Sequence, residues 1–180
     1  MAKITIRRYP MKLHAKNPLR VFITLLCLSL ITSCGFQLRG QYLLPQELQT
    51  LYVSSEDNFG ELTRLVKQHL TINDVNVLPT PKSNVPELRI LRDQLNRRTL
   101  SVLPNGQVAE YELIYTVNYR ITLPDQEPQN FNFDLYREYQ DDPNAALAKS
   151  RELNLLLSEM RGRAADRILR ELAAVDVSGK

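Results

Sequence analysis

The chain has 180 residues, a formal net charge of +3, two cysteines and two histidines. So few cysteines and histidines exclude a disulfide-stapled scaffold and the Cys/His spacings of a structural zinc site. The positive charge is unevenly placed, because six of the 23 Lys and Arg residues fall within residues 1–20, where no Asp or Glu occurs.

The first element in chain order is an export signal. The basic segment is followed by an apolar run over residues 21–31, shorter than the roughly 20 residues of a membrane span. The run ends in Ile-Thr-Ser-Cys, which resembles the lipobox of bacterial lipoproteins. We therefore expect residues 1–33 to be removed and Cys34 to carry the lipid anchor of a single domain, residues 34–180. The alternative is an ordinary signal peptide or signal anchor in which Cys34 has no special role.

Removal of this leader changes what the composition implies. Loss of six cations from 23 leaves 17 against 20 acidic residues, so the remaining chain has a net charge of −3 and does not predict nucleic-acid binding. Gly35 follows the cysteine where an Asp would resemble an inner-membrane retention signal, which favours the outer membrane. His69 is the sole remaining histidine, expected to be partly buried or on the surface. No nucleophile motif, phosphate loop or metal-ligand spacing occurs, which predicts a non-enzymatic protein without cofactor or metal.

The first half of the mature chain predicts a strand, a helix and a short strand. Residues 48–54 are rich in β-prone side chains. Asn58 is placed to cap a helix over residues 59–70, and residues 75–78 form a short strand or extended link before a proline-rich stretch. The apolar stripe of the helix consists of Leu62, Leu65, Val66, His69 and Leu70.

Two long strands with a tight turn between them form the clearest pattern in the sequence. They cover residues 87–103 and 108–123, and in the second strand every odd-numbered residue from Ala109 to Leu123 is apolar or tyrosine. Such an alternation predicts a strand with one buried face. Asn105-Gly106 tolerates the positive φ angles of a hairpin turn, so we expect antiparallel pairing. This turn is either purely structural or part of a site.

A further strand and a long helix complete the chain. Residues 131–139 alternate again, and Asp142-Pro143 is typical of a helix start. We expect a helix from Pro143 to residue 172, with charged residues such as Arg161 mostly facing water and residues 173–180 forming a frayed tail. Helices packed on one face of a mixed or antiparallel sheet give an α+β two-layer sandwich.

Three segments of the mature chain occur together in a characteristic order: Cys-Gly-Phe-Gln-Leu-Arg at 34–39, Asn-Gly-Gln-Val-Ala-Glu-Tyr at 105–111, and Asp-Pro-Asn-Ala-Ala-Leu-Ala-Lys at 142–149. This ordered set resembles the LptE family of lipopolysaccharide-assembly lipoproteins of Gram-negative bacteria. The resemblance implies two helices against a four-stranded sheet, in an outer-membrane lipoprotein on the periplasmic side. It also implies a place inside the lumen of a β-barrel partner, LptD, support of barrel assembly, and lipopolysaccharide binding during delivery to the cell surface.

The resemblance also points to basic residues for lipopolysaccharide contact. Lys149 matches a basic residue implicated in that contact in the family. A second basic residue of the family directly precedes Asn-Gly, where this chain has Pro104, so that contact does not transfer. Arg97 and Arg98, expected on opposite faces of their strand, are candidates to supply the charge, because lipid A phosphates bind guanidinium and ammonium groups strongly. The alternative for all three cations is an ordinary solvated surface.

Two functions of different classes remain open. The first is the non-catalytic plug and assembly partner of a barrel, and the second is a free-standing periplasmic lipoprotein that carries or presents an amphiphile. An open groove of lipid size would favour the second function. A filled core with a polar outer surface would favour the first, because a barrel lumen is polar.

Overall fold

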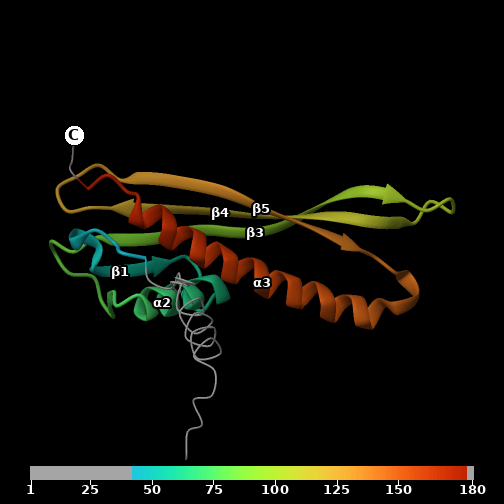
Figure 1. Cartoon of the computed structure of the whole chain (residues 1–180), viewed down its shortest axis with the longest axis horizontal. Coiled ribbons are helices and arrows are strands. Elements are labelled where there is room, and N and C mark those ends of the chain that lie inside the picture. The colour runs from blue at the N-terminus through green and yellow to red at the C-terminus, as the bar shows by residue number, and fades with distance from the viewer. Residues whose placement is uncertain (1–41, 178–180) are drawn as a thin grey trace, which may run out of the picture. The chain divides into compact units, whose positions relative to one another are not determined.

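The computed structural model describes residues 42–177, so the lipidation predicted at Cys34 and the tether after it lie outside the described residues. Within this range one mixed sheet carries two helices on one face (Figure 1). The strand order is β2-β1-β3-β4-β5, in which β1 runs parallel to β2 and β3, and β3, β4 and β5 are antiparallel. The strands are β1 (Thr50–Ser55), β2 (Asn76–Leu78), β3 (Glu87–Val102), β4 (Val108–Thr122) and β5 (Gln129–Gln140), and the helices α2 (Glu61–Ile72) and α3 (Ala146–Ala173).

The predicted α+β two-layer architecture is confirmed, with a difference in the number of strands. The sheet has five strands among the described residues instead of four, because the three residues of β2 form a ladder with β1. The first strand also begins later than residue 48, since Gln46–Leu48 form a 3-10 turn and β1 starts at Thr50. None of the described helices is long and apolar enough to cross a membrane.

The start of α2 differs from the sequence prediction because a neighbouring residue organises the loop. Gly60, not Asn58, is the N-cap, and no side chain caps the helix. Asp57 takes over instead: its carboxylate accepts from the Phe59 amide at 3.1 Å, and its carbonyl accepts from the Thr63 hydroxyl at 3.1 Å. The predicted stripe on α2 is otherwise confirmed, with Leu62, Val66 and Leu70 buried and Leu65 and His69 half-buried.

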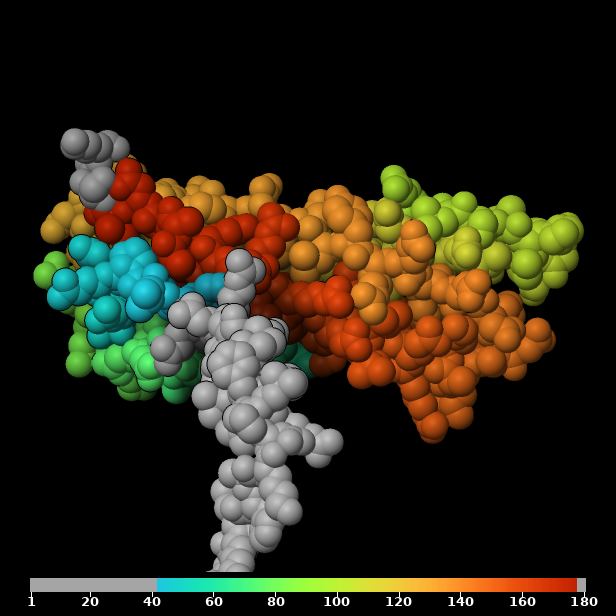
Figure 2. All heavy atoms as spheres, in the orientation of Figure 1, coloured from blue at the N-terminus to red at the C-terminus, as the bar shows by residue number. Residues whose placement is uncertain are grey.

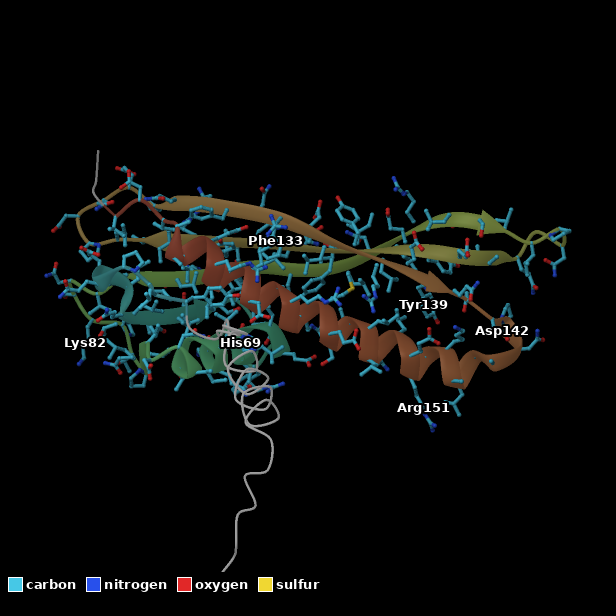
Figure 3. The ribbon with its side chains drawn as sticks, in the orientation of Figure 1. His69, Lys82, Phe133, Tyr139, Asp142 and Arg151 are labelled. Atoms are coloured by element: carbon cyan, nitrogen blue, oxygen red, sulfur yellow. The ribbon has the colours of Figure 1, made fainter. Side chains whose placement is uncertain are left out.

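Helix α3 begins three residues later than predicted, at Ala146. Asp142 accepts from the Asn144 amide at 2.9 Å, but it caps a short 3-10 turn, Pro143–Ala145, that precedes the α-helix. Further along, Asp166 Oδ1 lies 2.8 Å from Nδ1 of His69, which Figure 3 labels, so this pair connects α3 to α2.

The β3–β4 turn uses a single residue with positive φ. Gly106 has φ +82°, whereas Asn105 does not adopt a positive φ. The Gly106 amide donates to the Leu103 carbonyl at 2.9 Å, and the Leu103 amide donates to the Gln107 carbonyl at 2.7 Å. A loop of this kind favours proline after its first residue and glycine near its end, which accounts for Pro104 and Gly106. The antiparallel pairing predicted from Asn-Gly is confirmed.

The hydrophobic core occupies one half of the sheet, beneath α2 and the C-terminal half of α3. In β3 no residue after Ile90 is buried, and in α3 none before Met160 is buried. We call the part with the core the proximal half, and residues 95–112 and 136–156 the distal half. In Figure 1 the β3–β4 turn and the start of α3 lie at the same end of the described structure.

Candidate functional site

A row of two cations and two tyrosines crosses the distal half on the face that carries the helices. The guanidinium of Arg97 lies 5.2 Å from the ring centroid of Tyr111. Tyr111 is paired across the β4–β5 ladder with Tyr139, and the ammonium of Lys149 lies 5.2 Å from the Tyr139 ring centroid. Cations at this distance over tyrosine rings are attracted by the ring quadrupole. We call these four residues the cation–aromatic row.

A β-bulge in β3 explains why Arg97 belongs to this row. Before the bulge, Leu88 and Ile90 pair with Ile121 and Tyr119 and face the core. The register shifts between Ile90 and Arg92, and afterwards the odd-numbered residues of β3 lie opposite the odd-numbered residues of β4, with Arg97 opposite Leu113. A bulge inserts one unpaired residue and re-aims the side chains that follow it. Arg97 therefore faces the helices.

Arg98 lies on the opposite face of the sheet. It pairs with Glu112 directly across the β3–β4 ladder, and its guanidinium lies 2.7 Å from the Glu112 carboxylate. Successive residues of a strand point to opposite faces, so Arg98 and Arg97 cannot serve the same small site. The predicted placement of the two arginines on opposite faces is confirmed, and their role in ligand contact stays a prediction.

Lys149 is held in place by both of its neighbours. The Tyr139 hydroxyl donates to the Lys149 carbonyl at 3.0 Å, and Tyr139 is labelled in Figure 3. The Lys149 ammonium lies 2.8 Å from the Glu152 carboxylate. The bond to Glu152 raises the pKa of Lys149. Burial and the nearby Asp141 raise the pKa of the Tyr139 hydroxyl. Lys149 is therefore charged and Tyr139 neutral at physiological pH.

Large apolar side chains are also exposed at the distal end. They project from the tip of the β3–β4 hairpin, from β5 and from the first half of α3, whose surfaces form the yellow-green and orange regions of Figure 2. The exposed side chains are Leu100, Val102, Leu103, Tyr136, Leu147 and Leu155. Val102 and Tyr136 lie on the face opposite the row, because they pair with even-numbered residues of β4. Exposed apolar groups gathered beside charged groups are typical of a binding surface.

A cluster of polar residues, not predicted from the sequence, joins both helices to the sheet. Arg161 of α3 lies 2.6 Å from the carboxylate of Glu61 on α2 and 3.8 Å from that of Asp93 on β3. Asp93 also accepts from the Tyr115 hydroxyl at 2.6 Å, and Glu61 accepts from the Ser158 hydroxyl at 2.7 Å. The expectation that Arg161 faces water is wrong, because the bulge in β3 turns Asp93 toward the helices. We call this group the central polar cluster.

Contacts within the cluster shift the pKa values of its members so that Glu61 and Arg161 stay charged and Tyr115 stays neutral. The hydrogen bond from Ser158 and the charge of Arg161 lower the pKa of Glu61, against the effect of burial. Burial alone would lower the pKa of Arg161, but its bonds to Glu61 and Tyr115 outweigh that effect and raise it. Burial, together with the bond to Asp93, raises the pKa of Tyr115. The cluster is therefore an ion pair supported by neutral hydroxyl groups.

Known proteins resemble this chain over most of its length. The family model described as "LptE: Lipopolysaccharide-assembly" matches residues 48–172. The chain belongs to the LptE family. A relative from Pectobacterium atrosepticum, named LPS-assembly lipoprotein LptE, is 36% identical over 162 residues, which is 88% of each chain. The LptE of Yersinia enterocolitica is 36% identical over 87% of this chain and 77% of its own.

Solved structures agree with this membership of the LptE family. The rare lipoprotein B of Shewanella oneidensis is 50% identical and superposes with a TM-score of 0.65, covering 69% of this chain and 94% of that one. A lipoprotein B from Nitrosomonas europaea is 25% identical with a TM-score of 0.61, covering 81% of this chain and 94% of its own.

Proposed function

We propose that the protein is a lipid-anchored outer-membrane protein that takes part in lipopolysaccharide assembly by binding, without catalysing a reaction. The observation that carries this proposal is the 36% identity over 88% of both chains to a protein named LPS-assembly lipoprotein. The predicted lipobox at Cys34 supports this proposal, because a lipid attached there after export would hold the domain on the periplasmic side of the membrane.

The distal half is the part that enters the lumen of the LptD barrel and supports its assembly. In this half the β3–β4 hairpin extends beyond the core and buries few side chains of its own. Its exposed apolar and charged groups gain partners only if another surface covers them. A barrel lumen, which is lined largely by polar groups, suits the charged face of such a hairpin.

The cation–aromatic row binds the phosphate groups of lipopolysaccharide. Arg97 and Lys149 are two cations on one face, and the exposed leucines at the tip of the same hairpin, Leu100 and Leu103, suit the acyl chains of an amphiphile. Guanidinium and ammonium groups form charge-assisted bonds with phosphate, roughly twice as strong as neutral hydrogen bonds.

The test is charge reversal on one face, with the opposite face as a matched control. Arg97→Asp combined with Lys149→Asp should weaken lipopolysaccharide binding more than binding of an uncharged amphiphile, in a titration with labelled ligand. The difference should shrink as salt rises, because exposed charges are screened over about 8 Å at physiological ionic strength. Arg98→Asp should bind like the parent. Equal binding by the double variant and the parent at low salt, with unchanged circular dichroism, would remove the row from the site.

The alternative function, an amphiphile carrier, receives less support from the cavities bordered by described residues. One cavity of about 290 Å³ lies between Glu47, Asn84 and Leu123, and another of about 200 Å³ lies between Tyr42, Gln49 and Asn73. Each is smaller than the roughly 300–1,000 Å³ of pockets for drug-sized ligands. Neither cavity accommodates a lipid with several acyl chains.

A further inference from the structure

Three large apolar side chains are exposed around α2, in the proximal half. Phe59, in the loop that leads into α2, is 100% exposed, and Leu43 is 90% exposed. Ile72, in the last turn of α2, is 60% exposed and continues the outward stripe of Arg64 and Gln68 at a spacing of four residues. We call Leu43, Phe59 and Ile72 the α2 patch. It is separate from the cation–aromatic row, which lies in the distal half.

The described chain starts beside this patch. The Tyr42 amide donates to Asn73 Oδ1 at 2.9 Å, directly after the end of α2, and Arg170 donates to the Tyr42 hydroxyl at 3.3 Å. These bonds hold residue 42 at the C-terminal end of α2. The cysteine expected to carry the anchor is eight residues earlier in the sequence.

This length of chain limits how far α2 can lie from the membrane. Eight residues span at most about 28 Å when fully extended, and less in any other conformation. A lipidated Cys34 therefore keeps the C-terminal end of α2 within about 28 Å of the bilayer surface. Helix α2 is itself about 18 Å long, so Phe59, which precedes its N-terminal end, reaches the same surface when the helix lies along the membrane.

We infer that the α2 patch rests on the phospholipid surface of the leaflet that holds the anchor, with Phe59 and Ile72 inserted at the level of the headgroups. This inference rests on the lipid anchor of the proposed function. Apolar and aromatic side chains bind at such a depth by burying apolar area. The distal half then projects away from this surface contact, toward the barrel partner.

The charges around the patch indicate which lipids it accepts. Glu56 and Asp57 come shortly before Phe59, and the charge of Arg64 is partly offset by Glu61, 3.9 Å away. Lys67 of α2 and Arg170 beside Tyr42 are cations, so the three acids and three cations near the patch give no net attraction to anionic headgroups. The contact is therefore hydrophobic, and neither anionic lipid nor low salt strengthens it.

The absence of tryptophan from the sequence allows a direct test with single reporters. Phe59→Trp and Ile72→Trp are introduced separately into the full lipidated chain, together with a control, Leu155→Trp, on α3 in the distal half. Leu155 is 61% exposed, close to the 60% of Ile72, so the control begins from the same exposure. Each variant is placed in vesicles of phosphatidylcholine and phosphatidylethanolamine with brominated acyl chains, and again with phosphatidylglycerol added.

Tryptophan at positions 59 and 72 should emit at shorter wavelength than in water and lose most of its intensity to bromine, equally with and without phosphatidylglycerol. Tryptophan at 155 should keep its emission. Unquenched reporters at 59 and 72 on protein that floats with the vesicles would overturn the inference and leave the anchor standing. The inference would also be overturned by a wavelength shift without bromine quenching that is seen only when the LptD barrel is added to the vesicles. The patch would then contact protein. Protein that does not float would contradict the anchor and the inference together.

Discussion

Gly106 is a residue at which backbone conformation, and not side-chain contact, decides the effect of a substitution. Its φ is +82°, and nothing lies within 4 Å of the position that a Cβ would occupy. Gly106→Val should therefore lower the free energy of unfolding by about 1–3 kcal/mol, measured by urea denaturation. Gly106→Asn should recover much of this loss, because asparagine tolerates the left-handed conformation. A urea midpoint unchanged by valine would show that the turn rearranges without cost.

Glu61 makes stability depend on pH in a defined direction. Its pKa in the folded protein lies below the ordinary value of 4.5 because Ser158 and Arg161 stabilise the carboxylate. The stabilisation is therefore complete above that ordinary value and is lost as pH falls through the lower, folded pKa. Glu61→Gln should unfold more easily at neutral pH and lose less stability than the parent on acidification.

Thermal melts from neutral pH to about pH 3 measure this difference between the two proteins. Glu127→Gln, in the exposed turn between β4 and β5, is the control and should follow the parent. A Glu61→Gln curve parallel to that of the parent throughout this range would exclude Glu61 as a source of the pH dependence.

At the scale of elements, α3 contains a glycine that its packing does not require. No atom outside the helix backbone lies within 4 Å of a Cβ built on Gly162, and its φ is not positive. Glycine within a helix is less favourable than alanine by about 1 kcal/mol. Gly162→Ala should raise the free energy of unfolding by up to about 1 kcal/mol, observed as a higher thermal midpoint. A lower midpoint would mean that α3 needs to bend at this residue.

The long elements could be predicted from the sequence because their patterns are extended. The alternation over β4 spans its whole length, and its odd-numbered residues from Leu113 to Ile121 are buried. Helix starts are predicted less accurately, because several residues compete for each cap: Gly60 is the N-cap of α2 where Asn58 is expected, and Asp142 caps a 3-10 turn before α3. The β2 strand is predicted only as a short strand or extended link, because three residues carry almost no periodic signal.

The candidate site could be predicted only in part, because a β-bulge decides which side chains share a face. The sequence indicates a basic pair at Arg97 and Arg98, but not which of them shares a face with Lys149. That assignment depends on the bulge after Ile90, which neither glycine nor proline marks in the sequence. The central polar cluster could not be predicted for this reason either, because the bulge turns Asp93 to the face on which it contacts Arg161.

At the scale of the whole molecule, the anchor decides where the two halves can act. Cys34→Ala should give an uncleaved or misprocessed protein without acyl chains, because signal peptidase of the lipoprotein type requires the cysteine. Mass spectrometry of the membrane fraction measures both the N-terminus and the acyl mass. A parent protein with a mature N-terminus elsewhere and no acyl mass would contradict the lipoprotein assignment. The described domain should fold alike in both forms, since its core lies within residues 44–175.

The bulge in β3 also affects how sequences of this family should be compared. Upstream of it even-numbered residues face the helices, and downstream, as far as Thr99, odd-numbered residues do. Leu91 is the unpaired residue, so deleting it would remove the bulge and leave Arg97 opposite Leu113, above the tyrosines. A relative without the extra residue would therefore present the same charged face as this chain. Its alignment needs a gap at this point, because an ungapped alignment would assign each following charged residue of the strand to the wrong face.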